Sequence, residues 1–193
     1  MQKPLETLQW ERRRKLQIRE AFRAGMTAWT DKPGDAVPFY IACADYLVPA
    51  QRRLIDQDMR LAELLESRVS PAQTDDREKI GALKARLRDS DVALRAFAAA
   101  AGDLRKRREA ACREFEVAAY EYIDFVVNVL GARSHSLRHL TSTLFTETDW
   151  EHIAGVTDVL IAEEGARYAT VQETAPAGAD PAAISTDRPA KPA

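Results

Sequence analysis

The placement of proline constrains this chain more than any other feature. Nine prolines occur in 193 residues, yet none lies between Pro71 and Pro176. Proline inside a helix removes a hydrogen bond and costs about 3 kcal/mol, so an interval this long without proline can hold several helices. Its abundant alanine, arginine, glutamate and leucine all have high helix propensity. We therefore predict an all-α protein.

The spacing of apolar residues indicates how these helices pack. From residue 78 onward, small and apolar side chains alternate three and four positions apart, a spacing typical of a buried bundle seam. These positions are Ile80, Leu83, Leu87, Ser90, Leu94, Phe97 and Ala101. Similar stripes cover residues 5–29, 37–69, 103–144 and 148–171. The sequence thus predicts an up-down four-helix bundle formed by the last four segments, with an additional N-terminal helix packed outside it.

Local signals set the expected boundaries. Residues 30–38 contain turn formers, and Pro49 is expected to kink the second helix or to begin a new one. Thr148 with Glu151 is typical of a capping box that opens the last helix. We predict an accessory helix and turn over residues 1–37 and a helix bundle over 38–172. Residues 173–193 contain four prolines and few large apolar side chains, so we expect a disordered tail there.

Composition and charge exclude several classes of protein. No run approaches the roughly 18 apolar residues that span a bilayer, and no leader-like segment opens the chain, so no membrane partner is expected. The formal charge of −2 and the acids beside the basic runs 12–15 and 105–108 favour solvated helix faces over a nucleic-acid site. Cys43 and Cys112 form neither a disulfide framework nor a metal knuckle, which predicts a cytoplasmic protein.

Four side chains are the candidate metal ligands. His135 and His139 are four residues apart and would share one helix face, while Asp58 and Glu164 fall on apolar stripes. The alternative interpretations are a surface pair for the two histidines and an ion pair for each carboxylate, with an arginine such as Arg133.

Two stretches resemble hemerythrin-like (cation-binding) domains. Residues 122–128 (YIDFVVN) with 144–150 (LFTETDW) resemble the later half of such a domain, and residues 53–65 resemble its first bundle helix. The resemblance implies a four-helix bundle whose inward histidines and carboxylates hold an iron pair. Where the family pattern has histidines this chain has Asp58 and Asn128, and Ala132 replaces a glutamate. The resemblance therefore implies a hemerythrin-like shell that has lost its metal.

From these observations we predict a non-enzymatic bundle that binds a protein partner or forms a homo-oligomer and needs no cofactor. The sequence contains no glycine-rich phosphate loop, no nucleophile elbow and no Cys-x-x-Cys motif. The alternative is a metal- or oxygen-binding protein that holds iron. Its ligands would be the three histidines (His135, His139 and His152) together with Asp58, Glu163 or Glu164.

Overall fold

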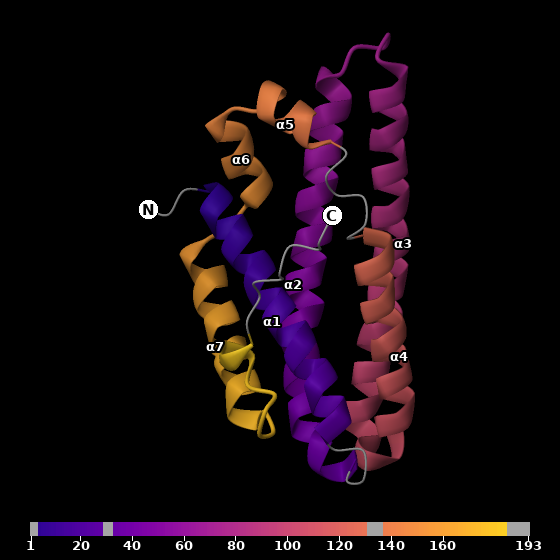
Figure 1. Ribbon diagram of the computed structural model, residues 1–193, viewed down its shortest axis with the longest axis vertical. Coiled ribbons are helices and arrows are strands. Elements are labelled where there is room, and N and C mark those ends of the chain that lie inside the picture. Colours follow the sequence, from indigo (N-terminus) through magenta and orange to yellow (C-terminus); the bar gives the residue numbers. More distant parts are fainter. Residues whose placement is uncertain (1–3, 29–32, 131–136, 185–193) are drawn as a thin grey trace, which may run out of the picture.

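The computed structural model describes residues 4–28, 33–130 and 137–184 (Figure 1). Within these ranges the chain forms α-helices and no strand, which confirms the all-α class. The helices are α1 (Pro4–Ala28), α2 (Pro33–Arg68), α3 (Thr74–Arg107), α4 (Cys112–Phe125), α5 (Arg138–Leu144), α6 (Glu147–Ala154) and α7 (Asp158–Thr174).

Helix α2 is the centre of the arrangement. It lies antiparallel to α3 along most of its length, and α1 and α7 pack against it (Figure 1). Helix α4 lies beside the C-terminal half of α3, whereas the short helices α5 and α6 pack against the C-terminal part of α2. The long helices therefore provide the frame, and the short ones cover one end of it.

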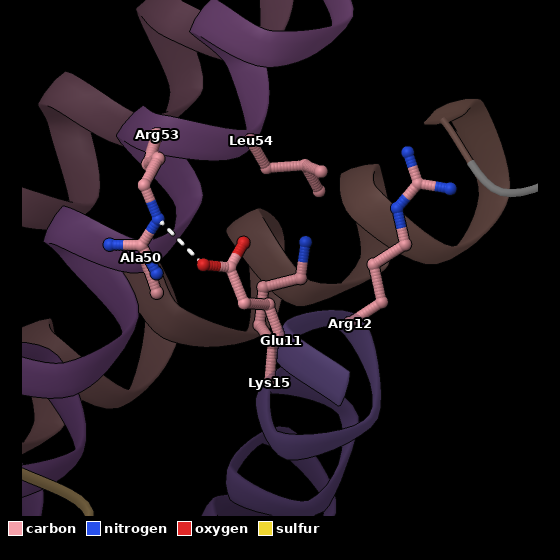
Figure 2. A pocket seen from close by; sticks show the side chains of 6 residues that line it. All are labelled: Glu11, Arg12, Lys15, Ala50, Arg53 and Leu54. Carbon is pink, nitrogen blue, oxygen red and sulfur yellow. Dashed lines mark ion pairs between the residues drawn. The ribbon is translucent and has the colours of Figure 1, made fainter. Parts of the chain in front are cut away.

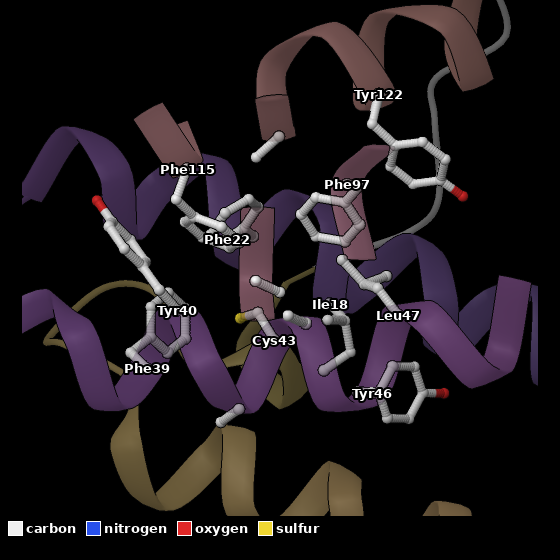
Figure 3. Close-up of a cluster of buried hydrophobic side chains, with 14 of the residues drawn as sticks. Ile18, Phe22, Phe39, Tyr40, Cys43, Tyr46, Leu47, Phe97, Phe115 and Tyr122 are labelled. Carbon is white, nitrogen blue, oxygen red and sulfur yellow. The ribbon is translucent and has the colours of Figure 1, made fainter. Parts of the chain in front are cut away.

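The main core is aromatic and draws on α1, α2, α3 and α4 (Figure 3). Phe22 of α1 makes edge-on contacts with Tyr40 of α2 and Phe115 of α4, at ring-centroid distances of 5.4 and 5.7 Å. Phe97 of α3 stacks on Phe115 at 5.6 Å. The first helix was expected to pack outside the bundle, but Ile18 and Phe22 are completely buried within this core. Helix α1 thus contributes directly to it.

A second, smaller core closes the other end of α2 and α3. Leu65 of α2 and Ile80 of α3 are buried there with Leu137 and Leu140, the latter on α5. Along α3 the predicted seam is correct: all of its positions are buried except Leu83, which is half-buried. The same helix face therefore serves both cores.

The prolines of α2 do not end it. Pro33 occupies the first helical position. A backbone N–H at that position would have no partner within the helix, so proline costs no hydrogen bond there. The helix continues through Pro38 and Pro49, so the expected turn at residues 30–38 is wrong for 33–38. Tertiary packing explains the difference, because Tyr40 and Tyr46, which lie between Pro38 and Pro49, are fully buried.

The segment expected to form one long helix over residues 103–144 is divided. Helix α3 continues past Gly102 to Arg107, and Arg108 then adopts a left-handed φ of 54°. A 3-10 turn (Arg108–Ala111) leads into α4, which passes into a π-helical turn over Val126–Leu130. The chain thereby reverses after α3, and Phe115 and Tyr122 of α4 lie in the core.

The predicted capping box is shifted by two residues. The hydroxyl of Thr146 accepts from the Asp149 N–H at 3.4 Å, and the Asp149 carboxylate accepts from the Thr146 N–H at 2.7 Å. Asp149 is also held by Arg68 at 2.6 Å, which anchors this corner to α2. Gly155 then takes a left-handed φ of 55° and ends α6, so the last predicted helix is two helices.

Part of the predicted disordered tail is ordered. Helix α7 reaches Thr174, and a 3-10 turn over Pro181–Ala183 follows it. Ala179 and Pro181 are buried, and Asp180 caps the turn by accepting from the Ala182 N–H at 2.9 Å. The segment has few large apolar side chains, but its small side chains pack on α1 and α7 and hold it in place. Residues 185–193 lie outside the described chain.

A glycine on α1 sets how closely α1 approaches α2. A Cβ atom at Gly25 would lie 2.3 Å from Cε1 of the Phe39 ring, whereas a Cβ at Gly81 on α3 would meet nothing within 4 Å. We expect Gly25→Ala to lower the free energy of unfolding by about 1–3 kcal/mol through overpacking. Gly81→Ala, the matched control, should raise it by about 0.5–1 kcal/mol through helix propensity. Urea unfolding of both variants checks the pair, and equal shifts of one sign would contradict this account.

Candidate functional site

A cluster of charged side chains lies where α1, α2 and α7 approach one another. Glu11 and Lys15 belong to α1, Arg53 belongs to α2 and Glu164 belongs to α7. On α1 these two residues lie seven and three positions before Ile18, on the same buried stripe. The position of that stripe explains why charged side chains enter a helix interface here.

Arg53 bridges two carboxylates inside this interface. Its Nε lies 3.3 Å from Oε1 of Glu11, and its Nη2 contacts Oε2 of Glu164. The Tyr46 hydroxyl donates a 2.6 Å hydrogen bond to the other oxygen of Glu164. The Glu164 side chain is only 4% exposed and that of Arg53 14%, so water screens these charges poorly. Each charge here depends on its partners.

The two carboxylates predicted as metal ligands are both ion-paired. Glu164 is engaged by Arg53 and Tyr46, and Asp58 accepts a hydrogen bond from Arg12 at 3.1 Å. The interpretation of each carboxylate as one half of an ion pair is confirmed. The arginine suggested for that role, Arg133, lies outside the described residues.

A small pocket adjoins the cluster between α1 and α2 (Figure 2). It has room for about one water molecule, 10 Å³, and is partly open to solvent. Glu11 and Lys15 point from α1 toward α2, while Arg12 points away from Arg53. The walls are formed by Glu11, Arg12, Lys15, Ala50, Arg53 and Leu54.

Burial shifts the titration of three groups in this region. Desolvation lowers the pKa of Lys15 to about 7, and the nearby Asp58 carboxylate opposes that shift only in part. Desolvation also raises the pKa of Glu11 and of Asp58, against the effect of the arginines beside them. The sequence predicted that the run from Glu11 to Lys15 lies on a solvated face. For Glu11 and Lys15 this prediction is wrong, because both side chains are desolvated in the structure.

The histidines lie elsewhere. His139 is exposed on α5, with its Nε2 3.5 Å from Oδ1 of Asp76 on α3. His152 is exposed on α6, and His135 falls outside the described residues. The structure therefore does not bring His139 to Asp58 or Glu164. In the described ranges, no three side chains of His, Cys, Asp or Glu are grouped so as to hold a metal ion.

The residues at the hemerythrin-like positions do not fit an iron pair. Asn128 is exposed, and its amide donates to the Asp124 carboxylate at 2.6 Å. Inside the bundle, Phe97 and Tyr122 stack with their ring centroids 5.1 Å apart and occupy the interior beside α4. Asp58 already has Arg12 as its partner.

The titration of Lys15 predicts a pH dependence of stability. Its pKa falls from 10.5 to about 7 on folding, so above pH 7 the unfolded chain binds more protons and the free energy of unfolding should rise with pH. The charged groups that act on the amine are Glu11, Arg12 and Arg19 of α1 and Asp58 of α2. Between pH 7 and 8.5 we expect wild type to gain stability and Lys15→Met to lack this gain, measured by urea unfolding.

The measurement stops at pH 8.5 so that the titration of other buried groups does not contribute. Burial raises the pKa of the Cys43 thiol and of the Tyr46 hydroxyl, which should lower stability at higher pH. Lys84→Met is the control, because Lys84 is paired with Glu66 at 2.8 Å. Parallel stability curves for wild type and Lys15→Met would contradict the assignment.

No helix in the described ranges combines the length and the apolar character that a membrane span requires. Comparison of the chain with protein-family models, with curated proteins and with solved structures finds no match in any of the three.

Proposed function

We propose that this protein is a non-enzymatic, cytoplasmic helical bundle without a di-iron centre that acts by binding a protein partner or by self-association. The observation that carries the proposal is the apolar start of α7. Val159 is 66% exposed and Ile161 38% exposed, with the half-buried Leu160 between them. A helical turn that exposes large apolar side chains is a candidate interaction surface.

The rest of α7 supports this interpretation. Glu164, Tyr168 and Val171 are buried and attach the helix to the bundle, so the exposed first turn sits on an anchored helix. A preordered apolar surface costs less entropy on binding than a flexible one. The resemblance to hemerythrin-like domains suggests a descent for the bundle and adds no ligand to it.

Sedimentation velocity of the purified protein, together with cross-linking in its native extract, tests the proposal. We expect concentration-dependent association, or one partner cross-linked in stoichiometric amount, and either should be lost in Val159→Ser/Ile161→Ser. Val92→Ser is the matched control, because Val92 is 61% exposed on α3, away from α7. A strictly monomeric protein without such a partner would overturn the proposal. So would stoichiometric iron in freshly purified protein.

A further inference from the structure

We propose that Lys15 is a covalent attachment site for a small aliphatic aldehyde, which its ε-amine binds as an imine in the pocket between α1 and α2. This pocket, shown in Figure 2, brings an amine and a carboxyl group together beside apolar atoms of Ala50 and Leu54. Imine formation needs an unprotonated amine, space for a carbonyl carbon and a proton donor. The pocket offers all three.

The amine of Lys15 is available as a nucleophile. It makes no hydrogen bond or ion pair with any residue that the structure describes, whereas Lys79 pairs with Asp76 and Lys84 with Glu66. A paired ammonium keeps its proton and does not attack. Desolvation, assisted by the positive charges of neighbouring arginines, brings the pKa of Lys15 to about 7. Lysines are activated in this way when they are desolvated or lie beside another cation.

Glu11 supplies the second group. It lines the same pocket, and burial raises the pKa of its carboxyl group, which favours the protonated form that can act as a general acid. The amine nitrogen first adds to the carbonyl carbon and forms a carbinolamine. Protonation of its hydroxyl by Glu11 then releases water, and loss of the nitrogen proton returns Glu11 to its starting state. The net reaction converts amine and aldehyde into imine and water, with no oxidant or reductant.

The size and walls of the pocket select the aldehyde. The space of 10 Å³ in this partly open pocket holds about one water molecule, which suits a carbonyl carbon that carries a short chain. The apolar wall favours an alkyl chain, which can extend toward solvent through the open side. An aromatic ring is larger than this space, so we expect an aromatic aldehyde to gain no advantage at Lys15.

Reductive trapping tests the site. The folded protein is incubated at pH 7 with limiting propanal and cyanoborohydride, and alkylated lysines are mapped by peptide mass spectrometry. We expect Lys15 to be modified at least about tenfold faster than Lys79 and Lys84, since each unit of pKa changes the neutral fraction about tenfold. Benzaldehyde should lose this selectivity, and so should protein unfolded in urea. Modification of Lys15 no faster than the other two would overturn the proposal.

Two variants separate the roles of the pocket residues. Lys15→Arg keeps a positive charge on α1 and should remove the fast site while the protein stays folded by circular dichroism. Glu11→Gln keeps the amine and should slow trapping at Lys15 severalfold, with the rates at Lys79 and Lys84 unchanged. An unchanged rate at Lys15 in Glu11→Gln would overturn the assignment of Glu11 as the proton donor.

Discussion

Replacing Arg53 by methionine is expected to lower the free energy of unfolding by about 3–5 kcal/mol, measured by urea unfolding at pH 7. The guanidinium contacts Glu164 and lies 3.3 Å from Glu11, and both carboxylates face little water. Methionine keeps most of the side-chain volume but leaves two carboxylates uncompensated in the α1–α2–α7 interface. The penalty comes from these stranded charges, because a buried ion pair by itself adds little net stability.

Two further variants isolate this cause. Arg167→Met removes an exposed ion pair with Glu163 on α7 and should cost about 0.3–0.5 kcal/mol. Arg53→Met combined with Glu164→Gln removes one stranded charge and should recover part of the loss, because the amide oxygen can still accept from Tyr46. If Arg53→Met costs no more than Arg167→Met, the buried network does not stabilise the interface.

Local periodicity predicted the helices well where packing follows the sequence stripe directly. The seam of α3 from Ile80 to Ala101 was correct, because a proline-free amphipathic segment buries the same face along its whole length. The apolar stripe of α1 could also be seen in the sequence, but the sequence did not show which part of the fold this stripe packs against. Whether Phe22 faces the core or an outer groove depends on Tyr40 and Phe115, which come from distant helices.

Helix ends were harder to predict, since they depend on contacts that the sequence does not display. The break after Arg107 is accompanied by an ion pair from Arg107 to Glu114 across the turn between α3 and α4, and by an ion pair from Arg105 to Asp45 of α2. Two capping boxes are compatible with the sequence, Thr146 with Asp149 and Thr148 with Glu151. The first one forms in the structure, and its Asp149 is ion-paired with Arg68 of α2. Local spacing alone cannot distinguish these two alternatives.

The candidate site was predictable in part. The stripe positions of Asp58 and Glu164 indicated partly buried carboxylates that need a cation, and both have one. Their arginines come from other helices, so sequence spacing could not identify them. Glu11 and Lys15 carried a signal that was overlooked: they continue the three-and-four spacing that leads to Ile18. Charged residues on an apolar stripe mark a buried network more reliably than charged residues in a run.

The participation of α1 in the main core leads to the other large expected effect. Phe22→Ala should lower the free energy of unfolding by about 3–5 kcal/mol, because it removes a fully buried ring that touches Tyr40 and Phe115 and leaves a cavity. Phe22→Leu fills most of that space and should cost less. Val117→Ala on the exposed side of α4 is the control, expected within about 0.5 kcal/mol of wild type.

This measurement also decides what α1 is. A helix packed outside an independent four-helix bundle could lose Phe22 with little effect on the rest of the chain. In the structure the ring of Phe22 joins α1 to α2 and α4, and Phe97 of α3 stacks on the same Phe115 (Figure 3). Unfolding of Phe22→Ala should therefore remain one cooperative transition at lower urea. A loss below about 1 kcal/mol, or a separate early transition, would instead mean that α1 is an accessory element.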